Sequence, residues 1–240
     1  MQFSMIGVCL DRKQFRRGSE NAPYEIRKAF GNIETFTNGV DLQDHWLKDF
    51  GNIIPSNYDD IEKQIKERIG LKGFPIILGG DHSITLPAVK ALKPKVFVSF
   101  DAHPDCDGND LSAKSVTRKI FESGFKTMLY GIRTVSKEES KFMKKNHIKI
   151  ATLKDLKKIK EPVYLSIDYD VLDPSIMPSV AYPEPNGLSF NDVLEGIKAL
   201  AKNLIAIDFV EFVPSENLTY AVIAGKLVYS SLAEIIKTLE

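Results

Sequence analysis

Short apolar runs alternate with amphipathic stretches along the whole chain. Seven of these runs predict β-strands, and most are continuously apolar, which is typical of strands covered on both faces. An eighth strand is predicted near Glu34–Thr37. The seven runs are Phe3–Cys9, Phe74–Leu78, Val96–Phe100, Thr127–Tyr130, Ile148–Thr152, Val163–Ile167 and Leu204–Phe209.

The amphipathic stretches between the strands carry recognisable helix starts. Residues 57–70 have isoleucines at steps of four and end in a glycine, a natural helix stop. Ser136 and Glu139 form a capping-box pattern. Ser189 opens a further helical pattern, and Tyr220–Leu239 predicts the longest helix.

This alternation of strands and helices predicts the fold class. Strand–helix–strand units form right-handed crossovers, so the sheet should be mainly parallel and lie between two helical layers. We therefore expect a three-layer α/β/α protein with about eight strands. No linker, repeat or low-complexity tract divides the sequence, which predicts one domain over residues 1–240.

Composition narrows the classes of function and partner. Of the 240 residues, 43% are hydrophobic, and 32 Lys plus Arg balance 32 Asp plus Glu, so no overall field favours nucleic acid or an anionic membrane. The N-terminus lacks the basic flank and apolar stretch of a secretory signal. The two cysteines, Cys9 and Cys106, lie far apart in sequence, which indicates a reducing environment. We expect a cytoplasmic protein with no nucleic-acid or membrane partner.

Residues that bind metals follow three of the predicted strands. GGDHS ends the strand that begins at Phe74, DAHPD follows Val96–Phe100, and DYD follows Val163–Ile167. Carboxyl ends of parallel strands meet at one edge of a sheet. Alternate residues of an extended segment also point the same way, so the side chains should converge. The candidate ligands are His82, Asp101, His103, Asp105, Asp168 and Asp170.

Four aspartates at close range would repel one another strongly unless cations lay between them. Carboxylate and imidazole ligands without thiolates suit Mn²⁺, with Zn²⁺, Fe²⁺ or Co²⁺ as alternatives. Each motif alone is often an ordinary turn or helix cap, but all three at strand ends predict a site for two metal ions. His45 and His147 lie in polar stretches and are predicted as surface residues. Cys106 is predicted as buried filler.

Four motifs, GGDHS, DAHPD, SIDYDVLDP and DFVEFVP, occur here in the order seen in the ureohydrolase (arginase/agmatinase) family, which this chain resembles. RRGSENAPYEIRKAF near the N-terminus is similar to that family too. The resemblance implies an arginase-like fold and cleavage of a guanidino or amidino compound to urea and an amine. It also implies a homo-oligomer, a trimer or hexamer.

The resemblance further implies how the ligands divide between two metal ions. Asp101 and Asp168 would bridge both ions. One ion would also bind His82 and Asp105, and the other His103 and Asp170. Glu211 matches the family glutamate that pairs with the substrate guanidinium, and Asp105 is the candidate proton carrier.

Two departures from the family pattern concern substrate and catalysis rather than the metals. Many members carry a proton-shuttling histidine after the DAHPD-type motif, where this chain has Ala113 or its neighbour Lys114. Tyr182 stands where the family has a small hydroxyl residue in the loop that lines the guanidinium pocket. Asp107 and Asp110 lie in the preceding loop and favour a cationic substrate, so agmatine is the first choice.

Other functions remain open from the sequence. The departures favour, as one alternative, a metal-retaining family member with little hydrolase activity that acts as a binding or assembly protein. Another guanidino or formimidoyl substrate, such as arginine or formimidoyl-glutamate, is a second alternative. A binuclear phosphoesterase ranks last, because such sites need further downstream histidines and only His147 follows His103.

Overall fold

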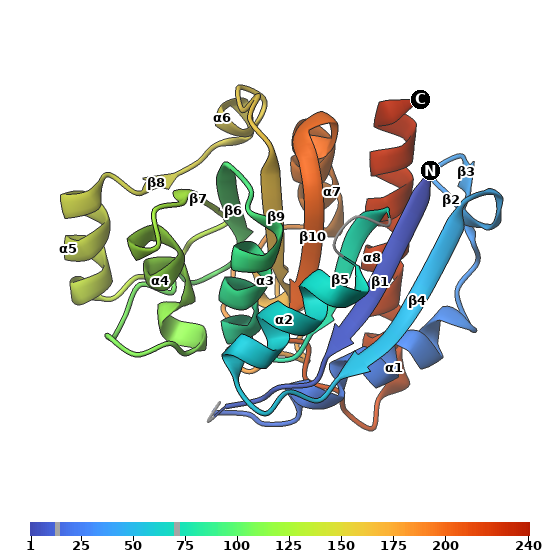
Figure 1. The fold of residues 1–240 in the computed structure, drawn as a ribbon, viewed down its shortest axis with the longest axis horizontal. Coiled ribbons are helices and arrows are strands. Elements are labelled where there is room, and N and C mark those ends of the chain that lie inside the picture. Colours follow the sequence, from blue (N-terminus) through green and yellow to red (C-terminus); the bar gives the residue numbers. More distant parts are fainter. Residues whose placement is uncertain (13–14, 70–72) are drawn as a thin grey trace.

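The computed structural model describes residues 1–12, 15–69 and 73–240 and shows an eight-stranded sheet between two helical layers (Figure 1). Its strands are all parallel and run in the order β4-β1-β5-β10-β9-β6-β7-β8. The predicted three-layer fold is confirmed. The strands are β1 (Gln2–Val8), β4 (Trp46–Ile53), β5 (Phe74–Gly79), β6 (Val96–Phe100), β7 (Lys126–Tyr130), β8 (Lys149–Ile150), β9 (Val163–Asp168) and β10 (Leu204–Val210).

The helices divide between the two faces of the sheet. Helices α1, α7 and α8 pack on one face, and α2, α3 and α4 on the other (Figure 1). The helices are α1 (Ala22–Phe30), α2 (Tyr58–Arg68), α3 (Thr85–Leu92), α4 (Val116–Glu122), α5 (Lys137–Asn146), α6 (Leu153–Leu156), α7 (Phe190–Leu200) and α8 (Leu218–Leu239).

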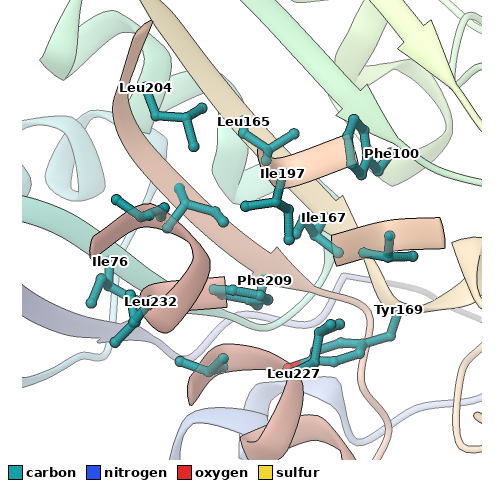
Figure 2. Close-up of a cluster of buried hydrophobic side chains, with 14 of the residues drawn as sticks. Ile76, Phe100, Leu165, Ile167, Tyr169, Ile197, Leu204, Phe209, Leu227 and Leu232 are labelled. Atoms are coloured by element: carbon teal, nitrogen blue, oxygen red, sulfur yellow. The ribbon is translucent and has the colours of Figure 1, made fainter. Parts of the chain in front are cut away.

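Side-chain alternation along the inner strands builds a core on each face. In β1, Phe3 and Met5 join the core under α1 and α8, whereas Ile6 and Val8 join the core under α2 and α3. Figure 2 shows part of the first core, where Phe209 of β10 lies among side chains from neighbouring strands and helices. Each such fully buried apolar side chain contributes about 1.5–3 kcal/mol to stability.

A strand does form near Glu34–Thr37, as predicted, but it does not belong to the main sheet. Phe36–Thr37 (β2) pairs antiparallel with Val40–Asp41 (β3) in a separate small ribbon, and the eighth sheet strand is β4 at the edge. Strand β4 carries charged and exposed residues because it has a neighbour on one side alone. A bulge at Gly51, whose φ is 73°, also interrupts its pairing with β1.

The predicted helix starts are confirmed. Ser136 and Ser189 both cap their helices in capping boxes, and Asn57 caps α2. The predicted glycine stop at position 70 lies outside the described residues. Helix α8 is long and apolar enough to cross a membrane, but 61% of its most apolar window is buried inside the protein, where Leu227 and Leu232 face the core (Figure 2). The apolar composition of α8 is therefore that of a helix packed in the core.

The strand order brings the predicted site residues to one edge of the sheet. Strands β5, β10, β9 and β6 are consecutive neighbours, and all four point the same way. Their carboxyl ends lead into Asp81-His82, Glu211, Asp168 and Asp101, respectively. The fold thus collects groups from four separate parts of the sequence.

Candidate metal centre

His82 lies at the middle of one group of carboxylates. Its Nδ1 is 2.9 Å from Asp105 Oδ2, 3.2 Å from Asp101 Oδ2 and 3.4 Å from Asp168 Oδ2. The imidazole is fully buried, in a short 3-10 turn (His82–Ile84) that follows β5. The cap of this turn is Asp81, whose side chain accepts the Ser83 N–H.

His103 forms a second group on the other side of Asp101. Its Nδ1 is 2.8 Å from Asp170 Oδ2 and 3.7 Å from Asp101 Oδ1. The donor atoms of His82, Asp101 and Asp168 lie within 4.8 Å of one another, and so do those of Asp101, His103 and Asp170. Asp101 is shared by the two groups.

Local turns, rather than extended strands, make these side chains converge. Strand β6 ends at Phe100, and Asp101 Oδ1 accepts the His103 N–H at 2.6 Å. After β9, Asp170 lies in a 3-10 turn and its N–H donates to Asp168 Oδ1 at 2.8 Å. Aspartates readily form such side-chain-to-backbone turns. The predicted convergence is therefore found, but the alternating extended geometry expected behind it is wrong.

The cluster concentrates negative charge in the interior. Eight acidic side chains are buried in the described part of the chain, and most of them lie in or beside this cluster. Burial, with the nearby charge of Asp101, raises the pKa of Asp105 to about 7. Burial would lower the pKa of His103, but Asp101 and Asp170 raise it to about 12. In the absence of metal, protons must supply the positive charge that the carboxylates need.

The donor atoms fit a metal pair. Among the described residues, His82 Nδ1 and Asp101 Oδ2 are buried and lie 3.2 Å apart, but their geometry is not that of a well-aligned hydrogen bond. Buried polar atoms nearly always have a partner, so these two are suited to ligating an ion. A set of carboxylates and imidazoles without thiolates suits a hard or borderline cation.

The metal-free protein should lose stability as the pH rises. Asp105 and His103 have higher pKa values in the folded state than in the unfolded state, so the folded state keeps their protons to higher pH. The free energy of unfolding that these protons contribute is therefore lost progressively as the pH rises above about 4. Metal ions replace those protons. We expect the difference in Tm between metal-loaded and chelator-treated protein to be larger at pH 8.5 than at pH 5.5. Equal differences at both pH values would contradict this explanation.

A cavity of about 350 Å³ opens above the cluster, and the residues from the two departures line it. Ala113 and Lys114 come from a 3-10 turn (Ala113–Ser115) before α4, and Tyr182 from the loop before α7. The full lining is His103, Asp105, Asp107, Ala113, Lys114, Thr134, Val135, Ser136, Glu139, Asp168, Asp170, Ala181, Tyr182 and Glu211.

Glu211 reaches the cavity from the end of β10. Its backbone is left-handed, with φ at 68°, and its N–H donates to Gly80 O at 2.8 Å. Its side-chain Oε1 accepts the His82 N–H at 2.7 Å. Left-handed backbone is uncommon for glutamate and is often found at functional sites, where the surroundings hold it in place.

Tyr182 forms part of the cavity wall beside the second group. Its hydroxyl accepts the Phe15 N–H at 3.1 Å, and its ring lies 6.2 Å from the His103 ring. The Lys114 Nζ lies 5.1 Å from the centre of the same ring. Tyr182 therefore narrows the cavity near His103 and holds a cation against its face.

Some of the other residues singled out from the sequence lie as predicted, and others do not. His147 is exposed, as predicted, but the His45 side chain is just 12% exposed and its Nδ1 lies 2.9 Å from the N-terminal amine. Cys9 and Cys106 are free thiols, and Cys106 is buried as predicted. Asp107 lines the cavity, whereas Asp110 is exposed outside that lining.

The segment after β7 supplies cavity residues that the sequence reasoning missed. Thr134, Val135, Ser136 and Glu139 all line the cavity. The signal was available, because β7 is a predicted parallel strand and its carboxyl end reaches the same edge as the other loops.

The profile of the arginase family matches residues 1–233 of this sequence. The chain belongs to the arginase family. The N(1)-aminopropylagmatine ureohydrolase of Thermococcus kodakarensis is 34% identical, over 98% of this chain and 91% of that protein. The agmatinase of Pyrococcus horikoshii is 34% identical, over 83% and 79% of the two chains. The crystal structure of the agmatine ureohydrolase of Thermoplasma volcanium superposes with a TM-score of 0.85 at 32% identity, and covers 98% and 91%.

Membership establishes the class of reaction. Arginase-family enzymes are hydrolases that act on the amidino C–N bonds of guanidino compounds and depend on a binuclear metal site. The two groups of ligand-type residues that share Asp101 are the matching feature of this chain. The predicted family, fold and enzyme class are confirmed, while the roles of single residues stay predictions.

Proposed function

We propose that this arginase-family hydrolase uses two Mn²⁺ ions to cleave agmatine, or a related guanidino compound with a cationic tail, to urea and an amine. The observation that carries the proposal is the acid-lined cavity directly above two ligand groups that share Asp101. Bound there, the ion pair supplies hydroxide near neutral pH. The proposed ligands are His82, Asp101, His103, Asp105, Asp168 and Asp170.

Glu211 is proposed to orient the substrate. Its carboxylate lies in the same cavity as Asp105 and Asp168, held by the His82 N–H. Opposite charge in a buried site draws the guanidinium to one place and fixes its carbon near the cluster. Asp105 also lines the cavity and is the proposed carrier of the proton to the leaving nitrogen.

The rest of the cavity favours a cationic tail. Apart from the proposed ligands and Glu211, its charged lining residues are the acids Asp107 and Glu139 and one cation, Lys114. The Glu139 carboxylate is already engaged by the backbone N–H groups of Cys106 and Ser136, so Asp107 is the better partner for an ammonium group. The relatives named agmatinase and N(1)-aminopropylagmatine ureohydrolase support this choice.

The direct test loads the protein with Mn²⁺ and measures urea release from agmatine, arginine and guanidinobutyrate, and formamide release from formimidoyl-glutamate. Agmatine should have the largest kcat/KM. A larger kcat/KM for arginine than for agmatine would overturn the proposal that the substrate has a cationic tail. If two Mn²⁺ bind and no compound is hydrolysed, the protein is instead a metal-retaining binding or assembly protein, the alternative that Ala113 and Tyr182 favour.

Replacing Glu211 with glutamine should lower kcat/KM for the best substrate about 10–100-fold, because one charge-assisted pair is worth about 1.5–3 kcal/mol. Both metal ions should remain, since Glu211 is not among the proposed ligands. Glu216→Gln, five positions along and exposed, is the matched control. Unchanged kinetics with Glu211→Gln would place this residue outside substrate binding.

We further propose that residues 1–240 act as a single domain in the cytoplasm and assemble as a homo-trimer or hexamer. The continuous eight-stranded sheet supports the single domain. Light scattering coupled to size-exclusion chromatography tests the assembly, and a monomer of 26.9 kDa would exclude it.

A further inference from the structure

Each histidine of the cluster has an oxygen behind it as well as carboxylates in front. The Nδ1 atoms of His82 and His103 face the aspartates. On the opposite side, His82 Nε2 lies 3.0 Å from Ser166 Oγ, and His103 Nε2 lies 3.6 Å from Glu184 Oε1. Ser166, Glu184 and the carboxylate behind Ser166 are not part of the cavity lining.

The group behind His82 is a buried carboxylate surrounded by hydroxyls. Asp208 Oδ2 accepts hydrogen bonds from Tyr164 Oη at 2.7 Å and Thr85 Oγ1 at 2.8 Å. Asp208 Oδ1 accepts the hydroxyl hydrogen of Ser166. Asp208 is fully buried, so this geometry is protected from water.

With Asp208 ionised, the form that its three hydroxyl donors favour, hydrogen counting gives the tautomer of His82. The single hydroxyl hydrogen of Ser166 is used on Asp208, so Ser166 Oγ can only accept from the imidazole. A neutral His82 must therefore carry its hydrogen on Nε2 and present the Nδ1 lone pair to the cluster. Glu184 Oε1 lies 3.6 Å from His103 Nε2, beyond hydrogen-bond distance, so a carboxylate there favours a hydrogen on this nitrogen by charge alone.

The backbone around Glu184 is tied to the second ligand group. The Arg133 guanidinium donates to Glu184 O at 2.8 Å and to Asp170 O at 2.6 Å. One side chain thus holds the loop that carries Glu184 against the turn that carries a proposed ligand. Glu184 is placed relative to His103 by this bridge, although its own side chain is 30% exposed.

We propose that Asp208, acting through Ser166, and Glu184 are positioning residues that set the affinity of the two metal ions separately. Asp208 and Ser166 orient His82 for one ion, and Glu184 orients His103 for the other. The inference rests on the proposed binuclear site. Such outer partners of metal-binding histidines typically change affinity about 10–100-fold.

The test is a calorimetric titration of the metal-free, full-length protein with MnCl₂. Ser166→Ala and Asp208→Asn should each weaken one equivalent of Mn²⁺ about 10–100-fold and leave the other unchanged. Glu184→Gln should weaken the other equivalent. Ser99→Ala is the matched control, because Ser99 is buried, lies opposite Ser166 in the adjacent strand β6, and its hydroxyl makes no hydrogen bond among the described residues.

A second comparison separates positioning from a general structural effect. His82→Ala should leave one tight Mn²⁺, and adding Ser166→Ala should not weaken it further, because Ser166 acts through the imidazole. A further loss of Mn²⁺ affinity in the double variant would overturn the proposal. Wild-type Mn²⁺ affinities in Ser166→Ala would also overturn it. If Asp208→Asn does not fold, the Ser166→Ala result alone decides. Fewer than two Mn²⁺ on the wild-type protein would instead overturn the proposed function.

Discussion

Asp101→Asn is expected to weaken both metal ions at once, by more than about 100-fold each, and to remove urea release with them. Asp101 Oδ2 lies 3.2 Å from His82 Nδ1 and its Oδ1 lies 3.7 Å from His103 Nδ1, so one carboxylate serves both groups. Loss of a hydrogen-bond partner behind a metal-binding histidine already lowers metal affinity about 10–100-fold, and loss of a shared charged ligand should lower it further. Metal content after gel filtration in Mn²⁺-free buffer measures the effect.

Two comparison variants test whether the effect arises because both ligand groups share Asp101. His103→Ala should remove one equivalent and keep the other, because His103 belongs to one group alone. Asp110→Asn removes an exposed carboxylate outside the cavity lining and should keep both. If Asp101→Asn retained one tight equivalent, the assignment of Asp101 to both ions would be wrong.

Ala113→His should raise kcat about tenfold or more and move the pH optimum towards neutral. Ala113 lines the cavity at the start of a 3-10 turn, so an imidazole there can reach the space above the cluster. A positioned general acid contributes about 10²–10⁴-fold, and histidine titrates near pH 6.5. The pH dependence of kcat and kcat/KM on the best substrate measures both changes, and metal content should stay the same.

Ala113→Gln is the matched control, because glutamine adds similar bulk without a titrating proton. It should gain nothing. Lys114→Met tests the neighbouring side chain that lies over the Tyr182 ring, since this lysine is the remaining candidate donor near position 113. If Ala113→His gains nothing while Lys114→Met loses most of its turnover, Lys114 already performs the shuttle.

The buried parts of the fold could be predicted from the sequence, and the edge could not. Strands such as Val96–Phe100 and Val163–Asp168 have neighbours on both sides and helices on both faces, so most of their residues are apolar, with Ser99 and Ser166 as buried polar exceptions inside them. Strand β4 meets one neighbour and solvent, and its pattern is broken by Gly51. The strand predicted near Glu34–Thr37 forms outside the main sheet, since a short β-rich run carries no information about which sheet it joins.

The candidate ligands could also be predicted, because their position after parallel strands depends on the order of elements alone. The groups behind them could not. Ser166 and His82 are 84 residues apart, and their contact with Asp208 requires that β10 lies between β5 and β9. That order is a property of the packed sheet. Turn geometry at Asp101 and Asp168 was likewise set by local side-chain-to-backbone hydrogen bonds rather than by strand alternation.

The buried acids of the cluster also affect the charge of the protein surface. Eight of the 32 acidic side chains are buried, whereas no lysine or arginine in the described part of the chain is. A formal net charge of zero therefore combines an anionic interior with a cationic exterior. Two divalent ions would offset four of those eight negative charges and give the loaded protein a formal positive charge, so it would migrate in an electric field as a cation at neutral pH. Its mobility in an electric field would therefore depend on its metal content as well as on its composition.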